Sequence, residues 1–374
     1  MTKIAMLLPD LDCGGAQRVI LDLANGLHDM GVEVDLVVAR GGGVLESQIP
    51  PNTNLIRLCK KHPPYLILGL LSYLALRKYI STKRPVALLS SVTGTNILSV
   101  LVRSTIPHQF RLVLRHENTS ENINSNWWRW LIRKTYPRAD LVITISPRAK
   151  SDLIKTAGLA NSFVRTIENP VNISRITKQA DEPLSLDADF TDATPTFLAV
   201  GRLSPQKDFD TLIEAFRFVN RTVQSRLMIL GEGACRHQLE LKLRRLGLEG
   251  SVYMPGVIPN PYPYFRRANV FVMSSRWEGL PIALMEAMAL GLPIVSTDCN
   301  SGPRELLDDG RLGHLVPIGN SKALANAMLL ALRSEHDPVP LIDRAKHYDL
   351  GPVLREHAHA LGLLTDAEWL DSSQ

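Results

Sequence analysis

The chain has 374 residues, which at about 150 residues per domain predicts two domains. Hydrophobic residues make up 45% and charged residues 21%, a composition that excludes a disordered or fibrous chain. Lys and Arg outnumber Asp and Glu by 42 to 37, and this net charge of +5 is spread along the chain without a long basic block. We therefore expect attraction to anions but no nucleic-acid partner.

The compartment is indicated by the cysteines and by the lack of long apolar segments. The four cysteines form no C-x-x-C pair and have no histidine spaced for zinc: Cys13, Cys59, Cys235 and Cys299. The apolar run before Pro9 is too short for a signal-peptide core. Residues 65–76 and 86–102 fall short of about 20 predominantly apolar residues. We expect a cytoplasmic protein with no segment that crosses a bilayer.

Short apolar runs alternate with helix-length amphipathic segments along most of the chain, which is typical of parallel sheets with crossover helices. The first series of predicted strands is 4–8, 33–38, 55–58, 87–89, 111–114 and 141–145. The second series is 196–200, 226–230, 252–254, 270–273, 293–297 and 314–316. The pattern predicts an α/β protein built from two Rossmann-like, doubly wound domains.

The boundary between the two series is predicted at residues 172–195, which are rich in Asp, Ser, Thr and Pro and lack clear periodicity. We interpret this stretch as linker and irregular chain. The N-terminal domain is predicted over residues 1–178 and the C-terminal domain over 190–354. The last segment, about 355–374, is expected to pack back on the N-terminal domain.

Ligands of doubly wound sheets bind beyond the carboxyl ends of the strands, so the loops that follow strands are the candidate sites. After the first predicted strand, Gly14 and Gly15 open a helix-like segment, where backbone N–H groups can approach an anion. The alternative is a tight turn. In the second half, one post-strand loop carries Gly201, Arg202 and Lys207, whose positive charges suit two adjacent phosphates. Its alternative is a solvated basic loop.

Two further loops of the second half differ in how specific their patterns are. Gly231-x-Gly233 follows a strand but lacks the third glycine of a dinucleotide fingerprint, so we interpret it as a close approach of backbone to a ligand or a neighbouring loop. Residues 273–291 contain a strand end, a loop and a helix that begins near Pro281 and ends at Gly291. Glu278 then lies in the loop and Glu286 among apolar helix neighbours. The Glu286 carboxylate needs a partner, which is a ligand hydroxyl, an internal arginine or a capping amide.

At these residues the chain resembles the retaining glycosyltransferases of the GT-B fold, in particular glycosyltransferase family 4, over nearly its whole length. Glu278-x7-Glu286 matches the E-x7-E motif of that family, and Gly201-Arg202 with Lys207 matches its diphosphate loop. Gly14-Gly15 matches its N-terminal glycine pair. The resemblance implies two domains facing a central cleft, with the acceptor on the N-terminal domain and a nucleotide sugar on the C-terminal domain.

The resemblance also implies roles for individual residues. Glu286 would hold the ribose hydroxyls of the nucleotide and Glu278 would contact the donor sugar. The remaining donor-binding residues would be Gly14, Gly15, Gly201, Arg202, Lys207, Gly279, Leu280 and Pro281, with Arg202 and Lys207 neutralising the pyrophosphate. His116, after a predicted strand, matches the histidine that the family places beside the reacting sugar. A lone histidine at a strand end is otherwise a packed or surface residue.

A divalent metal is the competing source of positive charge, since D-x-D triplets hold such ions in another glycosyltransferase fold. Three triplets match the pattern: Asp10-Leu11-Asp12, Asp187-Ala188-Asp189 and Asp208-Phe209-Asp210. Three matches in one ordinary chain argue for chance, and Asp208 with Asp210 suits the N-terminal charge of a helix. We expect no obligatory metal and no cofactor besides the nucleotide-sugar substrate.

The function expected from these residues is transfer of a sugar, with its anomeric configuration kept, from a nucleotide sugar, expected to be a UDP-sugar. The resemblance suggests a glycan or lipid-linked acceptor in cell-envelope polysaccharide or glycolipid synthesis. The alternatives are a nucleotide-sugar epimerase or phosphorylase on the same fold, and a nucleotide-sugar-binding module without turnover. Product analysis with and without acceptor separates the transferase from the epimerase or phosphorylase, and release of nucleoside diphosphate separates an enzyme from a binding module.

A membrane surface is a further expected partner. Trp127, Trp128 and Trp130 alternate with Arg129, Arg133 and Lys134 on one predicted helix, a composition that suits the interface of an anionic bilayer. The apolar segment 65–76 supports the same expectation. The alternative is that these tryptophans pack inside the domain or line the acceptor cleft.

Overall fold

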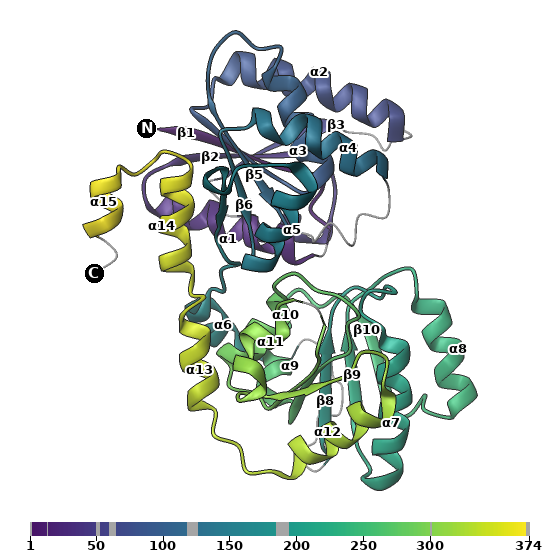
Figure 1. The fold of residues 1–374 in the computed structure, drawn as a ribbon. Coiled ribbons are helices and arrows are strands. Elements are labelled where there is room, and N and C mark those ends of the chain that lie inside the picture. Colours follow the sequence, from purple (N-terminus) through teal and green to yellow (C-terminus); the bar gives the residue numbers. More distant parts are fainter. Residues whose placement is uncertain are drawn as a thin grey trace. The chain divides into compact units, whose positions relative to one another are not determined.

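The computed structural model describes residues 2–12, 14–49, 53–59, 65–117, 126–184, 194–299 and 301–371. The chain forms two compact units, one of Met1–Pro170 with Leu350–Gln374 and one of Val171–Asp349 (Figure 1). The second unit thus begins at residue 171, whereas the sequence placed residues up to 178 in the N-terminal domain. The C-terminal segment returns to the first unit from residue 350 onward.

The first unit contains a parallel sheet of seven strands in the order β3-β2-β1-β4-β5-β6-β7. The strands are β1 (Lys3–Leu8), β2 (Glu33–Arg40), β3 (Asn54–Cys59), β4 (Ala87–Ser91), β5 (Arg111–His116), β6 (Leu141–Thr144) and β7 (Val164–Thr166). The six predicted strands are confirmed. The edge strand β7 was missed because two of its three residues, Arg165 and Thr166, are polar and form no apolar run.

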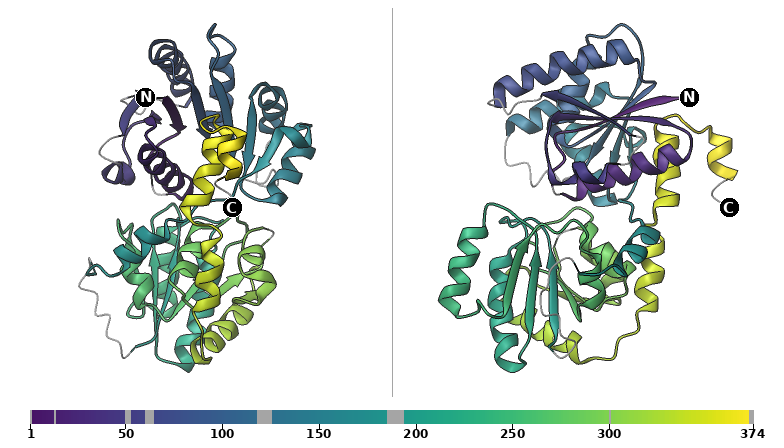
Figure 2. Two further views of the ribbon diagram at one scale, coloured as in Figure 1. Left: turned by 90° about the vertical axis from the view of Figure 1, so that its left-hand side faces the viewer. Right: turned by 180° about the vertical axis from the view of Figure 1, so that it is seen from behind.

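Helices cover both faces of this sheet (Figure 2). They are α1 (Gly15–Asp29), α2 (Tyr65–Lys83), α3 (Thr93–Arg103), α4 (Asn126–Thr135), α5 (Pro147–Ala157), α14 (Leu350–Ala360) and the short α15 (Asp366–Asp371). Helices α2 to α5 contribute Ile80, Val100, Ile132 and Leu153 to one apolar core with the strands. Helix α14 packs on α1, where a Cβ added to Gly26 would come within 2.6 Å of Leu354. A side chain at position 26 would require the Leu354 side chain to shift.

The second unit contains a parallel sheet of six strands in the order β10-β9-β8-β11-β12-β13. They are β8 (Thr196–Val200), β9 (Arg226–Leu230), β10 (Val252–Gly256), β11 (Val270–Met273), β12 (Ile294–Thr297) and β13 (His314–Val316), and all six were predicted. The helices are α6 (Ile173–Ala180), α7 (Phe209–Thr222), α8 (Arg236–Leu246), α9 (Tyr262–Arg267), α10 (Ile282–Ala289), α11 (Pro303–Leu306), α12 (Ser321–Arg333) and α13 (Val339–Lys346).

Helix α6 corrects the prediction of irregular chain over residues 172–195. The Asn172 side chain accepts a hydrogen bond from the backbone N–H of Arg175 at 2.9 Å and caps the helix. Ile176 and Ala180, four residues apart, are buried, and α6 packs against α9 and α10. The rest of that stretch, residues 185–193, lies outside the described residues.

Candidate functional site

The loop after β8 holds the basic residues predicted to meet a diphosphate. Lys207 extends from it to Glu278, and the Lys207 Nζ atom lies 2.6 Å from Glu278 Oε1. The two side chains are only 17% and 7% exposed. A Cβ on Gly201 would come within 2.9 Å of Lys207 Cε, so the glycine leaves room for this lysine to cross the backbone. The fold thus joins two predicted site residues that are 71 positions apart in the sequence.

Glu278 is held by more than the lysine. The Ser275 hydroxyl donates a hydrogen bond of 2.6 Å to the same carboxylate oxygen, Oε1. The Gln206 side-chain amide donates to the carbonyl of Trp277 at 3.0 Å, and the Ser301 hydroxyl donates to the Glu278 carbonyl at 2.5 Å. Loops from three strands therefore fix both the backbone and the carboxylate of Glu278.

Glu286 lies on α10 and is 2% exposed. The Tyr262 hydroxyl, at the start of α9, donates a hydrogen bond of 3.0 Å to Glu286 Oε1. A phenol was not among the partners that the sequence suggested. Tyr262 was missed because it lies in a Pro- and Tyr-rich stretch that carries no motif. This hydrogen bond holds the Glu286 carboxylate in one orientation.

The ends of α10 agree with the sequence analysis. Pro281 occupies the N-cap, and Gly291, with φ +67°, follows the last turn. The backbone N–H of Gly291 donates to the carbonyl of Met288 at 2.9 Å, and that of Leu292 donates to the carbonyl of Ala287 at 3.0 Å. Leu280 is buried. A Cβ on Gly302 would come within 2.5 Å of the carbonyl oxygen of Gly279.

The Arg202 side chain is open to solvent, whereas Gly231 and Gly233 pack closely against the loop after β8. The Arg202 side chain is exposed and has no hydrogen bond or ion pair to another described residue. A Cβ on Gly231 would lie 2.0 Å from the carbonyl oxygen of Gly201, and one on Gly233 would lie 2.4 Å from that of Leu203. The two glycines therefore permit close packing of neighbouring loops, one of the two interpretations left by the sequence.

Two of the acidic triplets have carboxylates in contact with basic side chains. Arg40 lies 3.0 Å from Asp10 and 3.2 Å from Asp12. Asp208 accepts a 2.9 Å hydrogen bond from the Thr211 hydroxyl as the N-cap of α7, and Arg276 lies 3.1 Å from it. The triplet at residues 187–189 lies outside the described residues. Within the described ranges, no three His, Cys, Asp or Glu side chains are grouped to hold a metal ion.

One of the described cysteines, Cys299, lies near Glu278 in the candidate site. Cys59, Cys235 and Cys299 carry free thiols, and Cys13 lies outside the described residues. Burial, with a smaller contribution from the negative charge of Glu278, raises the pKa of Cys299 to about 12. This thiol stays protonated at neutral pH and cannot act as a nucleophile there.

In the first unit, His116 ends β5 and is buried. Its Nδ1 atom lies 3.2 Å from the Tyr136 hydroxyl, and the two rings meet edge to face at 5.7 Å. The Asn96 side-chain amide donates to the same hydroxyl at 3.1 Å, and burial raises the pKa of Tyr136 to about 12. The imidazole orientation is therefore fixed by a neutral phenol. Gly14 and Gly15 open α1, as predicted, with Gly14 at the N-cap.

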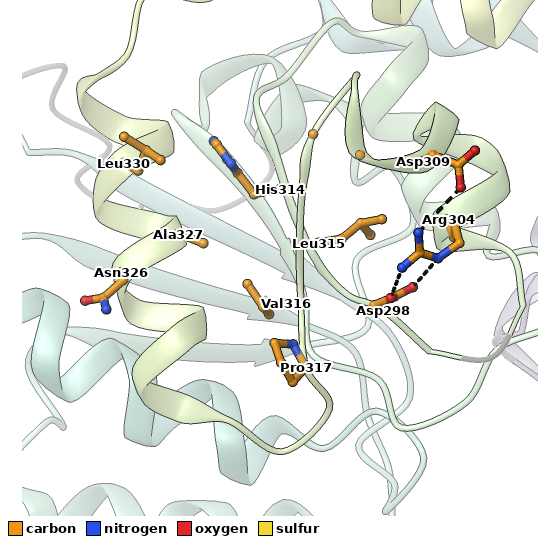
Figure 3. A pocket seen from close by; sticks show the side chains of 12 residues that line it. Asp298, Arg304, Asp309, His314, Leu315, Val316, Pro317, Asn326, Ala327 and Leu330 are labelled. Carbon is orange, nitrogen blue, oxygen red and sulfur yellow. Dashed lines mark hydrogen bonds and ion pairs between the residues drawn. The ribbon is translucent and has the colours of Figure 1, made fainter.

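A separate cavity of about 750 Å³ lies beside β13 and α12 in the second unit (Figure 3). The Arg304 guanidinium points to Asp298 and Asp309 on one side of it, while Leu330 and Asn326 of α12 line the other. None of the predicted donor-binding or catalytic residues lines this cavity.

Two all-parallel, doubly wound sheets in one chain are the architecture of the GT-B fold. Residues 187–348 match the family described as Glycosyl transferases group 1, and residues 13–175 match Glycosyltransferase Family 4. The chain therefore belongs to the group 1 and family 4 glycosyltransferases.

Two curated relatives from Campylobacter jejuni align over most of their length. N-acetylgalactosamine-N,N'-diacetylbacillosaminyl-diphospho-undecaprenol 4-alpha-N-acetylgalactosaminyltransferase is 28% identical over 90% of this chain and 91% of its own. A second transferase, which acts on GalNAc-alpha-(1->4)-GalNAc-alpha-(1->3)-diNAcBac-PP-undecaprenol, is 25% identical over 92% and 93%. Relatives of this chain thus include glycosyltransferases named for undecaprenol-linked acceptors.

Solved structures share the fold. HepE from Anabaena, in complex with UDP and glucose, superposes with a TM-score of 0.79 at 20% identity, covering 97% of this chain and all of that one. Sucrose-phosphate synthase from Thermosynechococcus elongatus gives 0.79 at 19% identity over 98% and 100%. Among the helices described here, none is long and apolar enough to cross a membrane.

Proposed function

We propose that this glycosyltransferase moves a sugar from a UDP-sugar to a lipid-linked or glycan acceptor of the cell envelope, with retention of the anomeric configuration. The observation that carries the proposal is the pairing of Lys207 with Glu278 in the loops after β8 and β11. The UDP-bound neighbour HepE and the undecaprenol-diphosphate relatives support the choice of donor and acceptor.

In the proposed site Glu286, oriented by Tyr262, holds the ribose hydroxyls of the donor. Arg202 and Lys207 neutralise the pyrophosphate, and Glu278 contacts the donor sugar together with the Gly279–Pro281 segment. Gly201 keeps the backbone open beside Lys207. In the first unit, Gly14 and Gly15 are proposed as donor-binding residues because they leave the N-terminus of α1 accessible to an anion.

The proposed chemistry follows from charge. When the bond between sugar and diphosphate breaks, negative charge grows on the leaving phosphate, and the Lys207 ammonium and the exposed Arg202 guanidinium stabilise it. The acceptor hydroxyl attacks from the same face, with the departing phosphate as its base. His116 stands beside the reacting sugar. We propose that no metal ion is required, because these cations supply the charge and Arg40 and Arg276 occupy the described acidic triplets.

The first test is a screen of sugar nucleotides for thermal stabilisation, followed by release of nucleoside diphosphate with and without a lipid-diphosphate glycan acceptor. NMR of the product then reports the anomeric configuration. Release that depends on acceptor supports the transferase, whereas an isomerised nucleotide sugar without acceptor indicates an epimerase. Lys207→Met removes the ammonium that is proposed to meet the diphosphate. Lys242→Met is its matched control, since Lys242 is buried and forms an ion pair with Asp210 at 2.7 Å.

We also propose that the first unit lies on an anionic membrane, where a lipid-linked acceptor is presented. Trp127, Trp128 and Trp130 of α4 are 62%, 41% and 48% exposed, which rules out the alternative that they pack inside the domain. Trp127 and Trp130 stack with ring centroids 5.0 Å apart. The exposed basic residues Arg133 and Lys134 on the same helix suit anionic lipid.

A second apolar surface lies on α2. Ile67, Leu70, Leu71 and Leu74 are exposed and spaced to share one face of the helix, with Arg77 and Lys78 following them. Both α2 and α4 pack against α3, and Figure 1 draws the three as neighbours. Apolar side chains next to basic ones are typical of a helix at a bilayer interface.

Sedimentation with vesicles of phosphatidylglycerol and phosphatidylcholine tests this surface. Trp127→Ser with Trp130→Ser should reduce binding, whereas Leu241→Ser, an equally exposed leucine on α8 of the second unit, should not. Absence of binding by the unaltered protein at low salt would refute the membrane contact, and unchanged binding by the tryptophan variant would refute its location on α4.

A further inference from the structure

The Arg115 side chain is fully buried in the first unit. It precedes His116 on β5, and successive strand residues point to opposite faces, so Arg115 points away from the Tyr136 ring that His116 contacts. Its guanidinium is ion-paired with Glu117 and donates a hydrogen bond to the side-chain oxygen of Asn169. The Ser91 hydroxyl donates to the same Glu117 carboxylate at 2.5 Å. Buried charge is costly unless it is paired in this way.

Asn169 is next to the point where the chain leaves the first unit, between Pro170 and Val171. The chain returns at Leu350 and enters α14, whose His357 is fully buried; the positive charge of Arg115, after burial, helps to lower the pKa of this histidine. On the side of the second unit the two crossing segments are tied together, because the backbone N–H of Val171 donates to the carbonyl of Tyr348 at 2.8 Å.

We propose that Arg115 is a positioning residue that fixes the His116–Glu117 end of β5 to the segment at Asn169, where the chain leaves the first unit. Its guanidinium contacts the Glu117 carboxylate and the side-chain oxygen of Asn169, so it joins these two residues. This inference rests on the proposed role of His116 beside the reacting sugar. Arg115 does not touch the substrate and acts through its neighbours.

A structural ion pair and a positioning residue predict different kinetics. Loss of a structural pair lowers stability and the amount of active protein. Loss of a positioning residue lowers kcat of the folded protein, because a displacement of about 1 Å at a reacting group can cost about a hundredfold in rate. Nucleotide affinity should not change, since Arg202, Lys207 and Glu286, which are proposed to hold the pyrophosphate and the ribose, belong to the second unit.

The test compares Asn169→Ala, Arg115→Lys and Arg115→Gln with Arg111→Gln. Arg111 is the matched control, because it lies on the same strand and donates to the carbonyl of Ala360 in α14 at 2.6 Å, but it is at the opposite end of β5. For each variant the thermal midpoint, the Kd for UDP and the values of kcat and KM at saturating donor are measured.

We expect kcat to fall about tenfold in Asn169→Ala and about a hundredfold in Arg115→Gln, with partial recovery in Arg115→Lys and an unchanged Kd for UDP. Values of kcat within twofold of the Arg111→Gln control would overturn the inference, as would losses that only follow the folded fraction. If Arg115→Gln does not fold, Asn169→Ala decides, since it keeps the guanidinium. An unaltered protein that binds no nucleotide and shows no turnover would instead refute the proposed function.

Discussion

His357 should make the first unit sensitive to acid. Its imidazole is fully buried on α14, with Nδ1 2.9 Å from the carbonyl of Val353. Burial and then the nearby charge of Arg115 lower the pKa of His357 from 6.5 to about 3. In the native protein the ring therefore stays neutral at pH values where the unfolded chain protonates it.

The magnitude follows from proton linkage. Between pH 6.5 and pH 3 the unfolded state binds one proton more than the native state, so the free energy of unfolding falls by about 1.4 kcal/mol for each pH unit of acidification. At pH 5 the loss relative to pH 7 is about 2 kcal/mol. For a unit of this size that corresponds to a drop in the unfolding midpoint of about 4–8 °C.

The assay is thermal unfolding at pH 7 and pH 5, followed by tryptophan fluorescence, because four of the five tryptophans belong to the first unit. His357→Leu removes the titrating group while keeping the site filled. Burial raises the pKa of the neighbouring Glu356, which contributes in the opposite direction, but both proteins carry it and its effect cancels in the comparison. If the two proteins lost the same stability between pH 7 and pH 5, the linkage to His357 would be disproved.

Three predictions concern the second unit. Tyr262→Phe should raise the Kd for UDP about tenfold or more, because the lost hydrogen bond to the Glu286 carboxylate is of a kind that contributes about 1.5–3 kcal/mol. Calorimetry measures this Kd, and an unchanged value would contradict the proposal that Tyr262 orients Glu286. Arg202→Ala and Lys207→Ala should each slow turnover. Lys207→Ala should also lower the thermal stability, because it leaves the carboxylate of Glu278 unpaired. Turnover rates and unfolding midpoints equal to those of the parent would indicate that the loop does not bind the diphosphate. Glu286→Gln should mainly weaken UDP binding and Glu278→Gln mainly lower kcat; the reverse pattern in titration and rate measurements would exchange the ribose and sugar positions.

Much of the fold could be predicted because buried parallel strands appear in the sequence as short apolar runs bounded by turn residues. The twelve predicted strands were recognised in this way, whereas β7 was not, because two of its three residues, Arg165 and Thr166, are polar. Helix α6 was missed for a related reason. Its eight residues are held by an Asn172 cap and by contacts with α9 and α10, which are tertiary features that a local pattern does not contain.

The site could be predicted as a set of residues but not as a set of contacts. The loop position of Glu278 and the helical position of Glu286 follow from Pro281 and Gly291, which mark the helix ends. The ion pair between Lys207 and Glu278 depends on how the loops after β8 and β11 meet. These two strands are adjacent in the sheet but are not consecutive in the sequence, so a local pattern cannot reveal the contact. Tyr262 illustrates the same limit, since its hydroxyl reaches Glu286 from another helix.

The pairing of Lys207 with Glu278 connects the two halves of the proposed chemistry. Without a donor, the Lys207 ammonium is neutralised by Glu278, so neither of these two mostly buried side chains is left as an uncompensated charge. A diphosphate that binds there competes with the Glu278 carboxylate for the Lys207 ammonium. The attraction between the phosphate and the ammonium becomes stronger as negative charge grows on the leaving group. Glu278 would then be released from the lysine as positive charge develops at the sugar carbon. In the proposed site, departure of the phosphate and stabilisation of the sugar are therefore linked through one ion pair.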